Sequence, residues 1–290
     1  MKDYNYIAGN EQILNEWCEK FVEKKKNDEA YKGYKIEDYF ARDGIMNKGD
    51  FDILNDGTII RKPSDTTYSK ENKMWKECPL RVLFLTKDEN AEVAWDVRKE
   101  TFYEKDCGLP PQNNTISGSF FYQNEACLLY GLWNTTPDKM IMYDDFSWED
   151  ALRFSDNNIF ARINCKKEVG GPMILNNDLQ DVIDKYYVYL EEQILNLDAD
   201  ILVCCGNQNE NNIILNTVYD IYANEFEYVN CVDGQGTGMH YNAKRNKLAI
   251  DAYHLAFFKG GLEARYNETV GMYYEFLKKH PDFIKSHRNK

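Results

Sequence analysis

Four short, mostly apolar runs punctuate the chain, and polar residues follow each of them directly. They span 81–85, 158–164, 201–205 and 248–253. An apolar run of this length that gives way to polar residues is typical of a strand that is buried on both faces and meets solvent at its carboxyl end. The pattern therefore predicts four strands of a buried, mainly parallel sheet.

Around these runs, apolar residues recur at helical spacing. The region 10–27 places six of them on one stripe: Ile13, Leu14, Trp17, Cys18, Phe21 and Val22. Residues 177–197 show the same period, and Asn177 with Gln180 resembles a capping box at the start. Further helices are predicted at 91–104, 119–133, 209–223 and 261–279. The alternation predicts an α/β fold, a three-layer α/β/α sandwich around a central, mainly parallel four-stranded sheet.

The segment before the first strand has a different composition. Residues 30–78 are polar and rich in turn residues, with one short hairpin predicted around Asp56-Gly57. We therefore expect residues 1–78 to form an N-terminal helix and an irregular extension packed on the core. Residues 79–290 are expected to form the α/β domain, with a further strand near 226–232.

Side chains able to do chemistry follow the carboxyl ends of the four predicted strands. Ligands bind at this edge in open α/β sheets. One crevice is therefore expected to collect Lys87, Asp88, Glu89, Asn90, Asn164, Lys166, Gly206, Asn207, Gln208 and His254. A carboxylate, an amide and an imidazole together can orient water, read a polar ligand edge and stabilise a developing anion. Taken singly, Asp88 is also a candidate helix N-cap, and His254 a candidate hydrogen-bonded core residue.

The charge is uneven along the chain. The formal net charge is −13, yet residues 241–290 hold ten Lys and Arg against five Asp and Glu. A globally acidic protein does not bind nucleic acid indiscriminately, whereas a local basic face binds phosphates. By itself, the basic segment is more simply interpreted as a solubilising helix.

Several classes of protein are excluded by what the sequence lacks. No apolar run reaches the roughly 18 residues of a membrane span, and the N-terminus lacks a signal-peptide pattern, so we expect a cytoplasmic protein without a membrane partner. The eight cysteines form no C-x-x-C pair, and the adjacent Cys204 and Cys205 are expected as small core residues rather than as part of a disulfide framework or zinc site. No cluster has metal-ligand spacing, so neither a metal nor another cofactor is expected. The remaining histidines are expected at the surface: His240, His280 and His287.

Four short motifs resemble, in order, those of the uracil-DNA glycosylase superfamily over about residues 80–280. They are Leu-Thr-Lys-Asp-Glu at 85–89, Phe-Ala-Arg-Ile-Asn at 160–164, Asp-Ile-Leu-Val-Cys-Cys-Gly at 200–206 and Asp-Ala-Tyr-His at 251–254. Asp-Gly-Ile-Met-Asn at 43–47, with the Lys-Asp-Glu-Asn and Arg-Ile-Asn-Cys-Lys-Lys runs, resembles a bacterial branch of the superfamily. The chain departs from the classical motifs where Thr86 stands for Gly, Glu89 for Pro, and Leu255-Ala256 for Pro-Ser. The iron–sulfur cysteines of one branch are absent.

The resemblance implies a uracil-DNA glycosylase-like fold and a DNA repair hydrolase that flips a base, uracil or another damaged base, and cleaves its N-glycosidic bond. It assigns catalysis to Asp88, which orients water, and to His254, which stabilises the departing base anion. The residues implied for base binding are Asn164, Asn90, Phe120 and Phe121. Those implied for phosphate or DNA contact are Lys87, Lys166, Lys244 and Lys259, with Leu255 or Phe257 as a wedge.

Two other functions fit the same residues. The altered motifs and the charge of −13 favour a non-catalytic protein on this fold that binds nucleotides, a small nucleic acid or a protein partner. A hydrolase of small nucleosides is the third hypothesis. Nucleobase binding without turnover would identify the former, and turnover of free nucleosides without DNA would identify the latter.

Overall fold

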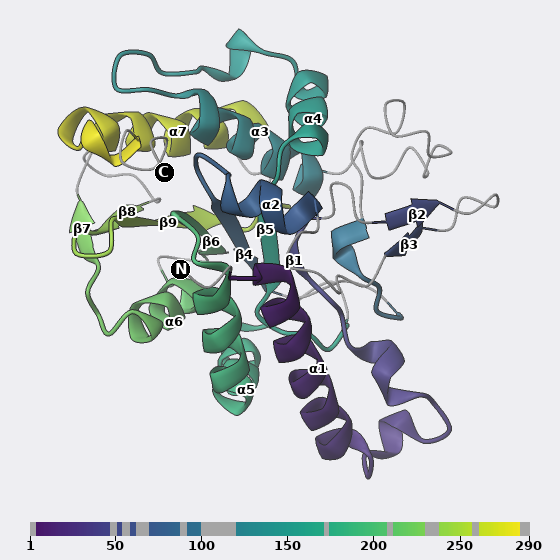
Figure 1. Ribbon diagram of the computed structural model, residues 1–290. Helices are drawn as coiled ribbons and strands as arrows, with labels where there is room; N and C mark the ends of the chain where they lie inside the picture. The colour runs from purple at the N-terminus through teal and green to yellow at the C-terminus, as the bar shows by residue number, and fades with distance from the viewer. Residues whose placement is uncertain are drawn as a thin grey trace.

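The computed structural model has an α/β fold (Figure 1). It describes residues 4–46, 51–53, 59–61, 70–87, 92–99, 120–170, 174–207, 211–229, 238–256 and 261–284. The helices are α1 (Tyr6–Lys25), α2 (Lys70–Lys76), α3 (Phe120–Asn134), α4 (Trp148–Asn157), α5 (Asn176–Leu197), α6 (Ile213–Ile221) and α7 (Leu262–Lys279). The strands are β1 (Gly44–Ile45), β2 (Phe51–Ile53), β3 (Ile59–Arg61), β4 (Val82–Thr86), β5 (Ala161–Asn164), β6 (Ile201–Asn207), β7 (Glu227–Val229), β8 (Gly238–Asn242) and β9 (Lys247–Tyr253).

A seven-stranded mixed sheet forms the centre, in the order β1-β5-β4-β6-β9-β8-β7. The four predicted strands are β4, β5, β6 and β9, and they are adjacent and parallel, which confirms that part of the prediction. The sheet is larger than the four strands expected. Antiparallel pairing adds β1 beside β5, and β8 and β7 beyond β9. No sequence pattern predicts β1 or β8, because β1 has only two residues and β8 contains the polar residues His240 and Asn242.

Helices cover both faces of the sheet, as Figure 1 shows. Alternate strand residues point to opposite faces. Leu83 and Leu202 pack in a cluster with α1, α5 and α6. Phe84 and Val203 pack on the other face with α3, α4 and α7.

Five of the six predicted helices are present, as α1, α3, α5, α6 and α7, although their ends differ from the prediction. Helix α1 begins at Tyr6, because the Asn5 side chain accepts a hydrogen bond from the Ala8 N–H and caps it there. The capping box expected at Asn177 is wrong, since α5 begins at Asn176 after Leu175, which makes no side-chain cap. Helix α4 was not predicted. Of the predicted helix 91–104, the described residues contain only a 3-10 turn at Val97–Lys99.

The N-terminal region contributes to the central structure. Its helix α1 packs in the same cluster as the sheet, and β1 is a strand of that sheet. The hairpin predicted around Asp56-Gly57 corresponds to the antiparallel pair β2 and β3, although the turn itself lies outside the described residues. In the part of the chain that the structure describes, no helix is both long and apolar enough to cross a membrane.

Candidate functional site at the carboxyl edge of the sheet

The four parallel strands end at one edge, which we call the carboxyl edge. The chain passes from β4 outward to β5 on one side, and from β6 outward to β9 on the other. The strand order therefore reverses between β4 and β6, and this kind of reversal opens a crevice outside the carboxyl ends of the strands. Asn164 ends β5, opposite Thr86 of β4, and His254 follows β9.

Asn164 is held at this edge through both its backbone and its side chain. Its backbone N–H donates to Oδ2 of Asp43 at 2.8 Å. Its side-chain oxygen accepts from the hydroxyl of Thr86, with 2.5 Å between Oγ1 and Oδ1. Only 4 % of Asn164 is exposed, so the amide sits in a rigid, nearly dry setting.

A buried ion pair between Lys167 and Asp43 supports Asn164, because Asp43 accepts the Asn164 backbone N–H. Nζ of Lys167 lies 2.6 Å and 2.5 Å from the two carboxylate oxygens of Asp43, and both side chains are almost fully buried. Gln193 of α5 donates to the same carboxylate at 2.9 Å, and Asn10 of α1 donates to the Asp43 carbonyl at 2.9 Å. Burial lowers the pKa of Lys167, and the Asp43 carboxylate acts against that shift. The pair therefore ties β5 to two helices.

Phe121 in the first turn of α3 contacts both sides of the carboxyl edge. Its ring centroid lies 6.0 Å from that of His254, and the Arg162 guanidinium of β5 lies 5.4 Å from the Phe121 centroid. Arg162 is buried and pairs with Glu125 of α3 at 3.7 Å. The ring thereby lies between the Arg162 side chain of β5 and His254, which follows β9.

The orientation of His254 follows from its backbone contact. The N–H of Ala256 donates to Nδ1 of His254 at 3.2 Å. Nδ1 is then an acceptor, so the neutral ring carries its proton on Nε2. Such an imidazole donates a hydrogen bond through Nε2 to an anion that develops beside it.

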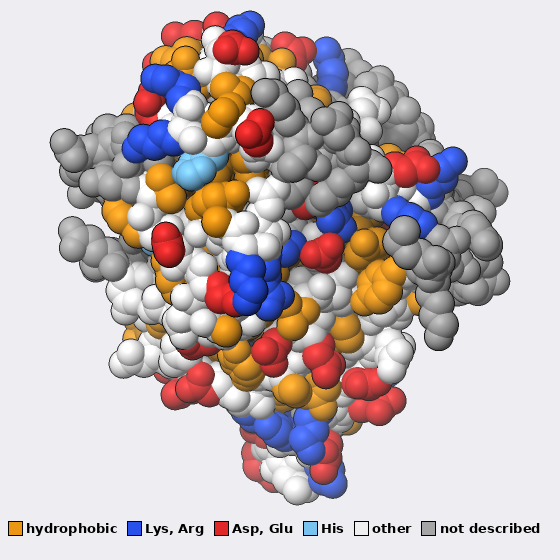
Figure 2. Space-filling model, turned by 60° about the vertical axis from the view of Figure 1, so that its left-hand side comes forward, with side chains coloured by type: hydrophobic (Ala, Val, Ile, Leu, Met, Phe, Trp, Pro, Cys, Tyr) orange, Lys and Arg blue, Asp and Glu red, His pale blue; other side chains and the backbone are white. Residues whose placement is uncertain are grey.

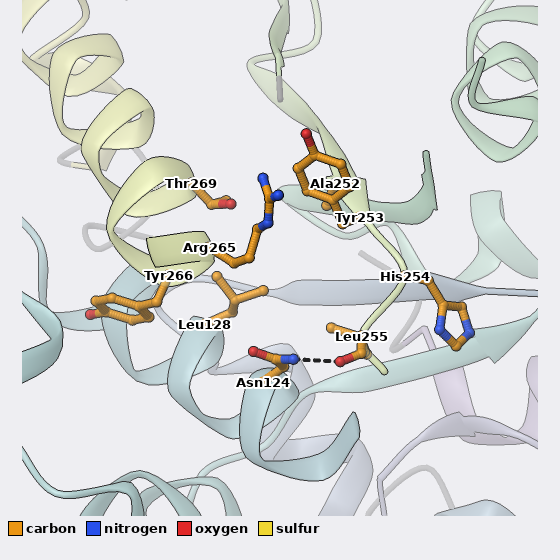
Figure 3. A pocket seen from close by; sticks show the side chains of 9 residues that line it. All are labelled: Asn124, Leu128, Ala252, Tyr253, His254, Leu255, Arg265, Tyr266 and Thr269. Carbon is orange, nitrogen blue, oxygen red and sulfur yellow. Dashed lines mark hydrogen bonds between the residues drawn. The ribbon is translucent and has the colours of Figure 1, made fainter. Parts of the chain in front are cut away.

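A small pocket lies beside His254, between β9 and helices α3 and α7 (Figure 3). Its volume is about 20 Å³, which is room for about one water molecule and not for a nucleobase. Figure 3 shows the Arg265 guanidinium against the Tyr253 ring, with 4.1 Å to the ring centroid. Arg265 also pairs with Glu268 at 2.8 Å. The pocket is therefore too small to be the base site, although polar and aromatic side chains line it beside His254.

Leu255, expected to act as a wedge, lies inside the protein. It is 2 % exposed, and its carbonyl accepts a hydrogen bond from the Asn124 side chain of α3, drawn as a dashed line in Figure 3. The side chain does not project into solvent. The contact instead fixes the first turns of α3 beside the end of β9.

The predicted basic contacts are spread over different parts of the molecule. Lys87 is 4 % exposed and donates to Asn176 of α5 at 3.3 Å. Lys166 is half-buried at the carboxyl edge, where its N–H donates to the Lys87 carbonyl. Lys244 lies in the turn before β9 and pairs with Glu225 at 2.5 Å. That turn is at the amino end of the seven-residue strand, about 20 Å from its other end, so Lys244 is not brought to the site.

Other predicted residues are placed as follows. Phe120, the neighbour of Phe121, is 48 % exposed at the start of α3. Asp88, Asn90, Phe257 and Lys259 lie outside the described residues. The expectation that the remaining histidines are at the surface is corrected for His240 and His280, which are both half-buried against aromatic rings, and His287 lies outside the described residues.

The sequence did not predict that Arg162 and Asp43 belong to the site. Arg162 carried a signal, because a charged residue inside a buried strand requires partners. Asp43 carried none, because its contacts with Asn164 and Lys167 join segments far apart in the sequence. Among the described residues, no group of three or more His, Cys, Asp and Glu side chains is placed to hold a metal ion.

Known proteins give no further guide to this site. Comparisons with protein-family models, with curated proteins and with solved structures found no match. The chemistry of the carboxyl edge therefore rests on its own residues.

Proposed function

We propose that this protein binds a flipped nucleobase at the carboxyl edge and hydrolyses its N-glycosidic bond in DNA. The observation that carries the proposal is that the Phe121 ring contacts both His254 and Arg162, which lies two residues before Asn164 in β5. An aromatic face stacks on any base, an amide reads a base edge, and an Nε2–H donor stabilises a leaving base anion.

Each residue has a role in that reaction. Asn164 hydrogen-bonds the base, and Phe121 stacks on it. Asp88, which follows Lys87 in the sequence, orients the attacking water, a role taken from the resemblance to uracil-DNA glycosylases. His254 donates a hydrogen bond through Nε2 to the base as the glycosidic bond breaks, so that the base leaves as a stabilised anion. Water adds to the sugar, and the proton that the water loses neutralises the departed base.

Base release from labelled oligonucleotides tests this function. Single- and double-stranded substrates carry uracil, hypoxanthine or xanthine, and wild type is compared with Asp88→Asn and His254→Ala. Asp138→Asn is the matched control, because Asp138 is exposed in the turn beyond the far end of α3. We expect both site variants to abolish release and the control to keep it. Full activity in either site variant, or no release by folded wild type on any substrate, would refute the proposal.

A second function, binding of a nucleotide without hydrolysis, is favoured by the buried position of Leu255, one of the two predicted wedge residues. Basic and acidic side chains are also interspersed on the face in Figure 2, and the basic ones do not merge into a continuous stripe there. Saturable nucleotide binding that depends on Phe121, together with no base release, would establish this alternative.

A further inference from the structure

We infer that Arg162 is a positioning residue, which holds the Phe121 ring in place so that a base can stack on it. The inference rests on the proposed function, since it takes Phe121 as the stacking ring of the base site. Arg162 is 3 % exposed, so it acts through the ring and not by contact with the ligand. Its effect on binding is therefore expected to disappear when the ring is removed.

Arg162 is a charged residue in the middle of a buried strand. Its register partners are Phe84 of β4, which is fully buried, and Gly44 of β1, which has no side chain. Glu125 of α3 is also fully buried and supplies the opposite charge, with 3.7 Å between the charged atoms. A buried ion pair is often no more stabilising than two apolar side chains of similar volume. The pair therefore indicates a role other than stability.

The Arg162 guanidinium contacts two aromatic rings in the first turn of α3. Its central carbon lies 5.4 Å from the ring centroid of Phe121 and 5.4 Å from that of Tyr122. Both distances allow a cation–π attraction, and a flat guanidinium can stack on aromatic faces. The two rings also meet edge to face, with their centroids 5.2 Å apart. The three side chains therefore form one packed unit.

The place of Phe121 in its helix explains why the ring needs this support. Helix α3 begins at Phe120, so Phe121 lies in the first turn, where backbone N–H groups have no intrahelical partner and helices fray. Ordering such a ring on binding would reduce the affinity for a ligand. Glu125 lies one turn further along α3, and it pairs with the same guanidinium. Arg162 therefore ties the start of α3 to β5.

This tie also sets where the ring lies relative to the rest of the site. Arg162 and Asn164 are two residues apart in β5, so their side chains leave the same face of the sheet. Phe160, two residues before Arg162, packs on that face with α3. The Phe121 ring contacts Arg162 there and lies 6.0 Å from the His254 ring. A ring already held in this position costs less to order when a base binds.

A double-mutant cycle tests whether Arg162 acts through Phe121. The affinity for a uracil-containing single-stranded oligonucleotide is measured for wild type, Phe121→Leu, Arg162→Lys and the combined variant. Lysine keeps the charge beside Glu125 but lacks the flat guanidinium. We expect Arg162→Lys to weaken binding about threefold to tenfold when Phe121 is present. In the Phe121→Leu background, it should change the affinity less than about twofold, because the two residues are coupled.

A second buried arginine provides the matched control. Arg81 is 6 % exposed, lies 3.5 Å from the Asp200 carboxylate and has its guanidinium 5.8 Å from the Tyr6 ring centroid. It immediately precedes β4, at the edge of the sheet opposite the carboxyl edge. Arg81→Lys therefore makes the same chemical change away from the site. We expect it to keep the wild-type affinity, even if it lowers the stability.

Two further measurements do not depend on the folding of Arg162→Lys or on a ligand. Arg162→Met combined with Glu125→Met replaces the buried pair by apolar side chains, and we expect the same loss of affinity. Fluorine NMR of ligand-free protein with para-fluorophenylalanine at position 121 reports the ring directly. We expect one sharp resonance with Arg162 present, and a broadened or doubled resonance without it.

The outcomes separate the positioning role from the proposed function. If Phe121→Leu weakens binding and the folded Arg162 variants do not, the positioning role is overturned and the proposed function stands. The same holds if the loss is equal with and without the ring, or if the fluorine resonance is unchanged. If wild type binds no base, the proposed function fails and the role of Arg162 in binding fails with it. A loss that depends on the ring supports both.

Discussion

The ring of Phe121 and the imidazole of His254 lie 6.0 Å apart, at an interplanar angle of 56°. Phe121 lies in the first turn of helix α3 and His254 follows strand β9, and they are 133 positions apart in the sequence. The contact matters because an aromatic face and a hydrogen-bond donor then border the same space at the carboxyl edge.

Replacing Phe121 by Leu is expected to weaken base binding. Stacking of a base on an aromatic ring contributes about 1–3 kcal/mol, and a leucine lacks the flat face that provides it. The affinity of uracil-containing oligonucleotides, measured by fluorescence anisotropy, checks this effect. Tyr34→Leu is the control, because Tyr34 is 63 % exposed on the N-terminal segment. Equal affinities of the Phe121 and Tyr34 variants would exclude a stacking role.

Removal of the Asp43 charge is expected to destabilise the fold strongly. Asp43→Asn leaves the buried Lys167 ammonium without its carboxylate, which costs about 3–5 kcal/mol in comparable buried pairs. Urea denaturation measures the loss in free energy of unfolding. Adding Lys167→Met to Asp43→Asn removes the stranded charge and is expected to restore part of the stability.

A solvent-exposed ion pair provides the comparison for that measurement. Glu29 and Lys32 are 3.1 Å apart, with both side chains largely exposed, so Glu29→Gln is expected to change stability little. If Asp43→Asn were as mild as Glu29→Gln, the buried pair would not support the end of β5 as described.

Acidification is expected to destabilise the protein through His240. Burial lowers the pKa of His240 to about 4, and Tyr219 contacts its Nδ1 at 2.7 Å. The unfolded chain binds this proton near pH 6.5 and the folded chain only near pH 4. The stability contributed by neutral His240 is therefore complete above pH 6.5 and is lost progressively as the pH falls to about 4.

Unfolding free energies at pH 7 and pH 5 check this dependence. From pH 7 to pH 5, wild type should lose about 2 kcal/mol more than His240→Asn, whose amide does not titrate. Direct NMR titration of the imidazole gives a second reading. Parallel pH profiles for the two proteins, or a His240 pKa near its ordinary value, would contradict the prediction.

Gly206 in β6 is expected to tolerate no side chain. A Cβ there would lie 2.5 Å from Oδ1 of Asn212, the residue that caps α6 and donates to the Cys204 carbonyl and to Asp251. Gly206→Ala should cost about 1–3 kcal/mol in free energy of unfolding. Gly271→Ala in α7 is the control, because its Cβ would meet nothing closer than Met140 at 3.5 Å, and it should be neutral or stabilising. Similar stabilities of the two variants would show that the cap adjusts freely.

Local patterns in the sequence determined the four parallel strands and most of the helices that connect them. Side-chain periodicity is a property of a few neighbouring residues, so a local pattern is enough to predict that a segment is buried. The apolar run ending at Leu85 and the apolar stripe through Trp17 are examples. The same reasoning placed Asn164 and His254 after strand ends, and therefore at one edge of a parallel sheet.

Only the tertiary structure decided which of the predicted residues meet. Strand order, the added edge strands and the burial of Leu255 depend on packing between distant segments, and a local pattern contains no record of its partner. Lys244 is an example. Its charge can be read from the sequence, but the β8–β9 hairpin places it at the edge of the sheet opposite the carboxyl edge. The contact of Thr86 with Asn164 arises in the same way, because strand register brings together residues 78 positions apart.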